Sequence, residues 1–181
     1  MIGREDVVLV KDETVRHQPM DAASLLNPPT EHRDDGLVRA YLAHRLGVDA
    51  AVVPMPSTTV AGLKALPYFD APKQGSKAKP KMIGAYPCAV FGTIAVDGRR
   101  HAHRIYVAPH GQGKADLGHT ADGVRRNPKK AARVIEGVSS VGCSVLWGDP
   151  QTASWIILTE GIETGAAVAL AFTEELQNGA V

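Results

Sequence analysis

The stretch CAVFGTIAVDGRRHAHRIYVAP, residues 88–109, decides the fold that we predict for this chain. Two runs rich in β-branched and aromatic residues flank Asp97-Gly98. This dipeptide favours a tight type I′ turn, because asparagine, aspartate and glycine tolerate the positive φ that such a turn requires. The stretch therefore predicts an antiparallel hairpin. Alternate residues of its second strand lie on opposite faces: Arg100, Ala102, Arg104 and Tyr106 on one face, and His101, His103, Ile105 and Val107 on the other.

The segments before the hairpin predict a helix and an irregular stretch. DDGLVRAYLAHRLG, residues 34–47, has the apolar spacing of a helix, with Asp34 or Asp35 as its N-cap and Gly47 as its C-cap. Residues 48–72 contain four prolines and predict irregular structure with short strands.

The C-terminal part predicts a strand–helix unit. SVLW, residues 144–147, and WIILT, residues 155–159, read as strands, the second of them buried. The helix expected over residues 161–176 has one apolar face, formed by Ile162, Ala166, Ala169, Leu170 and Leu176.

Together these segments predict an α+β fold in three parts. Residues 1–33 form a weakly structured segment with one strand candidate, DVVLV at 6–10. Residues 34–144 form a helical and basic β subdomain around the central hairpin-based sheet, and residues 145–181 the strand–helix unit. The length of 181 residues suits one ordinary domain with a small appendage.

Composition narrows the class of protein. Hydrophobic residues make up 44% of the chain, but no run approaches the roughly 18 apolar residues of a membrane span, so we expect no membrane partner. The N-terminal sequence is not that of a signal peptide, because charges stand on both sides of its short apolar run. Two isolated cysteines, Cys88 and Cys143, indicate reduced thiols and a cytoplasmic location.

The net charge of +1 hides a strong asymmetry. Residues 73–133 contain 13 basic and three acidic residues, a net charge of +10, whereas the rest of the chain has a net charge of −9. Such a basic block favours a polyanion partner, because neutralising phosphates releases counterions. The alternative is a solvated basic face without a partner. The nucleic-acid-binding candidates within the block are Arg99, Arg100, Arg104, Arg125, Arg126, Lys129 and Lys130.

Two other motifs in this block lack the residues that their chemistry needs. HGQGKAD, residues 110–116, contains the Gly-Lys pair of a phosphate loop, but Ala108, five residues before the pair, and Ala115, after it, stand where the loop needs glycine and Ser or Thr. The segment therefore predicts a flexible turn. His101 and His103 share a strand face, but no third metal ligand stands near them in sequence.

Glu160 is a candidate catalytic and metal-binding residue. It follows the expected strand WIILT and precedes Gly161, so it lies where ligands bind at the carboxyl ends of strands in open α/β sheets. A carboxylate at this point suits Mg²⁺, which one or two carboxylates and substrate phosphates usually hold. It is also typical of the first turn of a helix, where the dipole favours negative charge.

IILTEGIETGAAVAL, residues 156–170, resembles the first motif of the Toprim domain, in which a strand ends in Glu-Gly before a helix. Four earlier segments follow the order found in bacterial-type DNA primases and in primase-like proteins of phages and mobile elements. VRAYLAHRLGVDAAVV resembles their YL-x-x-R-G helix, and AVFGTIAVDGRRHAHRIYV their basic hairpin. NPKKAARVIEG is similar to their P-K-x-x segment, and SVLWG to the strand before the Toprim motif.

The resemblance implies that Glu160 belongs to a Mg²⁺-dependent nucleotidyl-transfer centre. It also implies that Arg104, Lys129 and Lys130 face single-stranded template or nucleotide. The sequence departs from the family because it has no Asp-x-Asp pair and too few cysteines for a zinc module, so we expect no primer synthesis from this chain alone. It is then either a piece of a larger protein or a shortened descendant.

Three functions remain open. The first is the nucleic-acid-binding part of a primase-like replication enzyme. The second is a non-catalytic module that binds nucleic acid or protein, with a partner or a homodimer held through the C-terminal helix. The third is a phage or plasmid regulator that uses the fold only as a scaffold.

Overall fold

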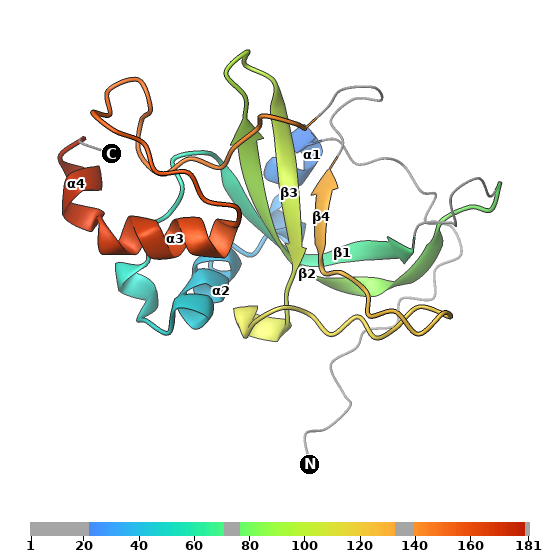
Figure 1. Ribbon diagram of the computed structural model, residues 1–181. Helices are drawn as coiled ribbons and strands as arrows, with labels where there is room; N and C mark the ends of the chain where they lie inside the picture. Colours follow the sequence, from blue (N-terminus) through green and yellow to red (C-terminus); the bar gives the residue numbers. More distant parts are fainter. Residues whose placement is uncertain (1–21, 71–76, 133–139, 180–181) are drawn as a thin grey trace.

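The computed structural model describes residues 22–70, 77–132 and 140–179. It is an α+β fold, as the sequence predicts, built from helices and a four-stranded antiparallel sheet (Figure 1). The helices and 3₁₀ turns (η) are α1 (Ala22–Leu26), η1 (Thr30–His32), α2 (Leu37–Leu46), η2 (Ala50–Val52), η3 (Pro109–Gly111), α3 (Ile162–Ala171) and α4 (Thr173–Gln177). The strands are β1 (Val60–Asp70), β2 (Lys81–Ile94), β3 (Arg100–Tyr106) and β4 (Lys129–Ala132), in the order β1-β2-β3-β4.

The predicted hairpin is the centre of this sheet, formed by β2 and β3, but its turn differs from the one expected. The N–H of Gly98 donates to the carbonyl of Ala95 at 2.9 Å, and the N–H of Ala95 donates to the carbonyl of Arg99 at 2.9 Å. A type I′ turn needs positive φ at both central residues. Gly98 has a φ of 81°, but Asp97 is not among the described residues with positive φ, so the turn is not of this type. The loop is therefore a three-residue turn with a left-handed glycine, stabilised by the Asp97 carboxylate, which accepts from the N–H of Arg99 at 3.1 Å.

The expectation of short strands over residues 48–72 is wrong, because β1 runs for 11 residues through Pro67. Proline lacks the N–H that an interior strand needs on both sides. β1 is an edge strand of the described sheet, and the bridge on its outer side is at Leu63, away from Pro67, so this proline interrupts no described ladder there. β2 also contains a proline, Pro87. It lies opposite the point between Leu63 and Leu66 where the register shifts, so it is accommodated at a bulge.

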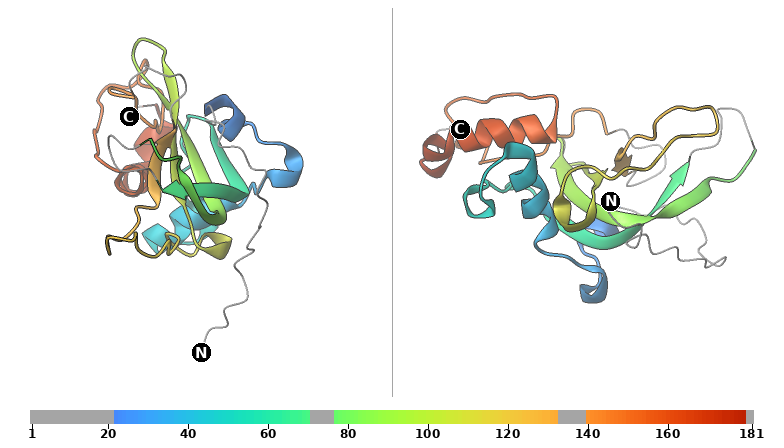
Figure 2. Two further views of the ribbon diagram at one scale, coloured as in Figure 1. Left: turned by 90° about the vertical axis from the view of Figure 1, so that its right-hand side faces the viewer. Right: turned by 90° about the horizontal axis from the view of Figure 1, so that it is seen from below.

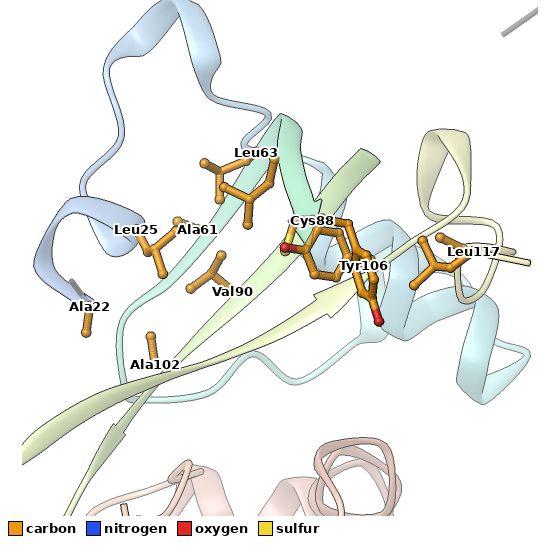
Figure 3. Close-up of a cluster of buried hydrophobic side chains, with 12 residues drawn as sticks. Ala22, Leu25, Ala61, Leu63, Cys88, Val90, Ala102, Tyr106 and Leu117 are labelled. Carbon is orange, nitrogen blue, oxygen red and sulfur yellow. The ribbon is translucent and has the colours of Figure 1, made fainter. Parts of the chain in front are cut away.

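The two faces of β3 pack into two cores, as the alternation predicts. One cluster contains Ala102 and Tyr106 together with Ala22 and Leu25 of α1. Figure 3 shows it with α1 on one side of Val90 and with Tyr106 and Leu117 on the other side. The helix α1 thus belongs to the folded core, although the sequence predicts weak structure over residues 1–33. The strand candidate at 6–10 lies outside the described residues.

The second core lies on the opposite face of the sheet, beneath α2 and α3. It contains Tyr41 of α2, Phe91 of β2, Ile105 of β3 and Ala166 of α3, each 0% exposed. The views in Figure 2 show α2 and α3 side by side on this face, with α1 across the sheet. Helix α3, predicted as part of a separate unit, therefore shares a core with the central sheet.

The helix α2 begins and ends close to the predicted positions. Its C-cap is Gly47, with a φ of 68°, and its N-cap is Gly36 instead of Asp34 or Asp35, without a side-chain cap hydrogen bond. The carboxylate of Asp34 accepts from the N–H of Gly36 at 3.2 Å, just before the helix. The chain passes so near β1 here that a Cβ on Gly62 would lie 2.0 Å from the carbonyl oxygen of Asp34.

The prediction of strands at 144–147 and 155–159 is wrong. Ser144 forms one isolated bridge with Ile94, and residues 155–159 are in no strand of the described structure. The expected burial fails too, since Ile156 is 62% and Leu158 is 86% exposed. An apolar run needs a neighbouring strand to satisfy its backbone, and none of the described strands lies beside this one. None of the helices in the described ranges has the length and apolarity to cross a bilayer.

Candidate nucleic-acid interface and carboxylate centre

The position of each predicted basic residue follows from the pairing of β3 with β4. Arg104 pairs with Lys130, and Ile105 pairs with Lys129. Because neighbouring residues of a strand point to opposite faces, Lys129 and Lys130 lie on different sides of the sheet. Lys130 shares the face of Arg104 and Tyr106, and Lys129 shares the face of α2 and α3.

On the face of Arg104 and Lys130, several basic side chains lie near the carboxylate of Asp70. The Nε of Arg126 donates to Oδ1 at 2.9 Å and its Nη2 donates to Oδ2 at 2.8 Å, so the ion pair is bidentate. The Nη1 of the same guanidinium donates to the carbonyl of Leu117 at 3.0 Å. The hydrogen bonds from Arg126 lower the pKa of Asp70 most, and the charges of Arg126, Lys130 and Lys81 lower it further.

Aromatic rings lie beside these cations. The ammonium group of Lys130 lies 3.8 Å from the centre of the Tyr68 ring and donates to the carbonyl of Phe69. Burial and the charge of Arg104 lower the pKa of Lys130, against the opposing effect of Asp70. The rings of Tyr68 and Tyr86 stand edge-on to Tyr106, with centroids 5.0 and 6.4 Å from it.

We name these residues the basic–aromatic cluster. It combines four cations, one carboxylate and two tyrosines: Lys81, Arg104, Arg126, Lys130, Asp70, Tyr68 and Tyr86. Its formal charge is therefore positive. Tyr86 is half-buried, and a Cβ on Gly84 would lie 3.2 Å from its ring, so the ring lies over the strand backbone beside it.

The other predicted basic residues lie elsewhere. Arg99 forms an ion pair of 2.6 Å with Asp97 in the hairpin turn, and Arg100 is exposed at the start of β3. Arg125 is exposed in the loop before β4. The structure thus brings Arg104, Arg126 and Lys130 together and separates them from the rest of the predicted set.

On the opposite face, the carboxylate of Glu163 forms a second centre, which we name the Glu163 centre. Its Oε1 accepts from the hydroxyl of Tyr41 at 2.8 Å and lies 3.1 Å from the Nζ of Lys114, and its Oε2 accepts from the Nζ of Lys129 at 2.8 Å. Burial alone would raise the pKa of Glu163, but the bonds from Lys129, its own backbone, Tyr41 and Lys114 lower it to about 2. Burial and the hydrogen bond to Glu163 raise the pKa of Tyr41 well above its ordinary value.

The HGQGKAD segment supplies Lys114 to this centre and is a packed loop instead of the predicted flexible turn. His110, Gly111 and Gly113 have φ values of 56°, 74° and 103°. Gly111 is buried, and a Cβ there would lie 2.7 Å from the backbone nitrogen of Tyr41, so only glycine fits against α2.

His103 lies near the Glu163 centre, where burial lowers its pKa most and the charge of Lys129 lowers it further. His101 is 2% exposed at the other end of β3. Within the described ranges, no three His, Cys, Asp or Glu side chains come together as metal ligands. His101 and His103 therefore have no third ligand among these residues with which to form a metal site.

Glu160, the predicted catalytic residue, is exposed at the start of α3. A Mg²⁺ centre there needs further oxygen ligands, and the described residues bring none together with it in a group of three. The carboxylate of Glu163 already contacts two ammonium groups and a hydroxyl. Glu163 is therefore engaged by these donors, and we derive no metal-dependent step from Glu160.

Sequence reasoning missed Glu163 as a site residue, although the pattern carried a signal for it. Glu163 lies three residues before Ala166 and seven before Leu170, in phase with the apolar face expected for the helix. A carboxylate on a buried helix face needs a hydrogen-bonding or charged partner that is also buried. Most of the basic side chains that could act as this partner lie in the basic block, residues 73–133.

Comparison of the chain with protein-family models, with curated proteins and with solved structures gives no match.

Proposed function

We propose that this chain binds single-stranded nucleic acid through the basic–aromatic cluster, as the template-binding part of a primase-like replication protein in the cytoplasm. The observation that carries the proposal is the arrangement of cations around Asp70, which forms a bidentate ion pair with Arg126 and pairs with Lys81 across β1 and β2. Lys130 lies over the Tyr68 ring on the same face and pairs with Arg104. Arg126 and Asp70 neutralise each other, so Lys81 and Lys130 leave an excess of positive charge that phosphate groups can neutralise.

The geometry supports a single strand better than a duplex. Binding of single strands combines a basic surface along the backbone with aromatic rings on which bases stack. Tyr86 is half-buried beside the cations and offers such a ring, whereas Tyr68 is buried beneath Lys130. Asp70 holds the Arg126 guanidinium in a fixed orientation, which reduces the entropy lost when a phosphate binds.

Adjacent lysines provide a matched test by fluorescence anisotropy with a labelled oligo-dT over a range of salt concentrations. We expect Lys130→Ala to weaken binding and to reduce the slope of log K against log salt by about 0.7, the value for one phosphate on a single strand. Lys129→Ala should leave the slope unchanged, because its ammonium group contacts Glu163 on the other face. Arg45→Ala, an exposed cation on α2, controls for net charge.

Tyr86→Leu tests the stacking role, and we expect a loss of about 1–3 kcal/mol in binding without a change in the salt slope. Absence of binding to oligo-dT at low salt would overturn the proposal. Equal effects of Lys129→Ala and Lys130→Ala on the slope would show that binding does not use this face.

A second candidate is a non-catalytic, protein-binding regulatory module of a phage or mobile element. The exposed side chains of Ile156 and Leu158 favour it, together with an apolar groove of about 540 Å³ that Met55, Leu170 and Leu176 line. The rest of the predicted helix face is internal, since Ala166 and Ala169 are buried. Analytical ultracentrifugation of wild type and Leu158→Ser tests it: self-association that the variant weakens favours this role, and a monomer at all concentrations excludes the homodimer.

A further inference from the structure

The helix α4 ends in an asparagine that is followed by glycine. Asn178 is the C-cap of α4, with a φ of −85° and a ψ of 0°, and its N–H donates to the carbonyl of Glu174 at 3.0 Å. Gly179 has a φ of 70°, and a Cβ there would meet nothing within 4 Å. Both residues are exposed, and α4 lies at the edge of the molecule (Figure 1). The Asn-Gly pair is therefore open to solvent at the end of a helix of five residues.

An asparagine can lose its side-chain amide without an enzyme. The backbone nitrogen of the next residue attacks the side-chain carbon Cγ, ammonia leaves, and a succinimide ring forms; water then opens this ring to aspartate or isoaspartate. Glycine favours the attack because it has no side chain beside the nitrogen and the widest range of backbone conformations. Proline prevents the attack because its nitrogen carries no hydrogen. Of the three asparagines in the sequence, Asn27 and Asn127 precede proline, so only Asn178 can react by this route.

Ring closure requires Asn178 to leave its helical conformation, and the structure opposes this only weakly. In the described part of the chain, the side-chain amide of Asn178 has no hydrogen-bond partner. The N–H of Gly179 donates to the carbonyl of Leu176 at 3.2 Å, which is a bond of the last helical turn. Helix ends fray at a free energy near zero. We therefore expect the folded chain to react nearly as fast as an unfolded one.

The β2–β3 turn contains a related pair, Asp97-Gly98, whose side chain the structure holds in place. Aspartate forms the same ring, with water leaving instead of ammonia. The carboxylate of Asp97 accepts from the N–H and the Nε of Arg99 at 3.1 and 2.6 Å, and these hydrogen bonds lower its pKa. An ionised, fixed carboxylate is a poor target for the attacking nitrogen. The structure therefore leaves the pair at Asn178 reactive and protects the pair at Asp97.

We propose that Asn178 is a selective site of spontaneous deamidation in the folded chain, and that the new carboxylate loosens the last turn of α4. Negative charge at the C-terminus of a helix is unfavourable in the field of the helix dipole. Glu174 lies four residues earlier, at a spacing where like charges on a helix repel. Leu176 and Gln177 of the same turn line the apolar groove of about 540 Å³, so the modification alters one wall of that groove. The proposal goes beyond both candidate functions and depends on neither.

The first experiment follows the reaction in the full chain at pH 8, folded in buffer and unfolded in guanidinium chloride. Cleavage after Glu175 releases LQNGAV, residues 176–181, and mass spectrometry gives the fraction in which NH₂ has been replaced by OH. We expect the folded chain to react within about fivefold of the unfolded rate, because opening the helix end requires little free energy. A slower folded rate, or no reaction, would overturn the proposal.

Two controls assign the reaction to its site. Asn178→Gln should leave the peptide unmodified, because its longer side chain closes the larger ring less readily; modification of this variant would move the reaction to Gln177 and refute the assignment. Isoaspartate at Asp97 should form at least about tenfold more slowly in the folded than in the unfolded chain. Equal protection of Asp97 and Asn178 by folding would contradict the selectivity.

The second experiment tests the effect on the helix. Asn178→Asp carries the charge of the product, and the N–H of Leu176 donates to the carbonyl of Phe172 at 3.0 Å within α4. By ¹H–¹⁵N NMR, we expect this amide to exchange its hydrogen at least about twofold faster in Asn178→Asp than in wild type, and at the wild-type rate in Asn178→Gln. Equal exchange in the two variants would show that the charge does not loosen α4.

Discussion

Glu163→Gln is the substitution that tests the Glu163 centre most directly. The side chain is 15% exposed, and its carboxylate joins α3 to α2 through Tyr41 and to β4 through Lys129. Its pKa is about 2 in the folded chain against an ordinary value of 4.5. Each pKa unit between the folded and unfolded states corresponds to about 1.4 kcal/mol, so the ionised carboxylate contributes about 3 kcal/mol at neutral pH.

The effect of the substitution should be smaller than this full value. The side chains of Lys114 and Lys129 are 34% and 32% exposed, so water screens part of each interaction. We therefore expect Glu163→Gln to lower the free energy of unfolding by about 2 kcal/mol at pH 7. For a chain of this size, that corresponds to a decrease in Tm of roughly 4–8 °C.

The sign of the pH dependence follows from the lowered pKa. A carboxyl whose folded pKa is depressed stabilises the fold above its unfolded pKa, and this stabilisation is lost as the pH falls through the folded pKa. For Glu163, the stabilisation is complete above about pH 5 and decreases toward pH 2. At pH 2.5, still above the folded pKa, about a quarter of this stabilisation remains, so the wild-type chain should lose about 1.5 kcal/mol more than Glu163→Gln between pH 6 and pH 2.5.

The assay is urea unfolding followed by circular dichroism at pH 7 and in steps down to pH 2.5. Glu160→Gln is the matched control, because it removes the same charge three residues away at an exposed position. It should change the free energy of unfolding by less than about 0.5 kcal/mol. If the two variants have the same stability and the same pH profile, the structural role of Glu163 is refuted.

Two further predictions concern close packing and thiol reactivity. Gly62→Ala places a Cβ against the carbonyl of Asp34 and should lower the free energy of unfolding in urea by at least about 3 kcal/mol. Gly36→Ala is the control, because the nearest contact of its Cβ is 3.7 Å away, and it should lower this free energy by less than about 0.5 kcal/mol. Equal decreases would contradict the packing of α2 on β1. Cys88 is fully buried and its pKa is raised to about 12 by burial, so a thiol-reactive disulfide reagent at pH 8 should modify Cys143 first and Cys88 only after unfolding; two rapidly reacting thiols in the native chain would refute this.

The elements that could be predicted are those that local sequence specifies. The β2–β3 hairpin depends on a turn dipeptide between two β-prone runs, and the faces of β3 depend on simple alternation, which places Tyr106 and Ile105 in separate cores. The α2 helix follows from apolar spacing and from Gly47 at its end. β1 could not be read in the same way, because a proline is tolerated or excluded according to its neighbours across the sheet.

The candidate site shows the same division. The basic block is a property of the sequence, and so is the presence of a carboxylate before the C-terminal helix. Which cations act together is decided by strand pairing: Lys129 and Lys130 are adjacent in the chain, yet one contacts Glu163 and the other lies over Tyr68. Likewise Glu160 is exposed while Glu163, three residues later, is held by three donors.

By itself, the sequence determined the hairpin, the alternation of its faces, the helices α2 and α3 and the concentration of positive charge, because each depends on neighbours along the chain. Only the tertiary structure decided the partners of each charge, the burial of His101 beside Thr93 and the exposure of residues 155–159. The physical reason is that the free energy of a charge or a polar group depends on the distance to its partner and on the water around it. Both quantities are fixed by segments far apart in the sequence, such as Tyr41 and Glu163.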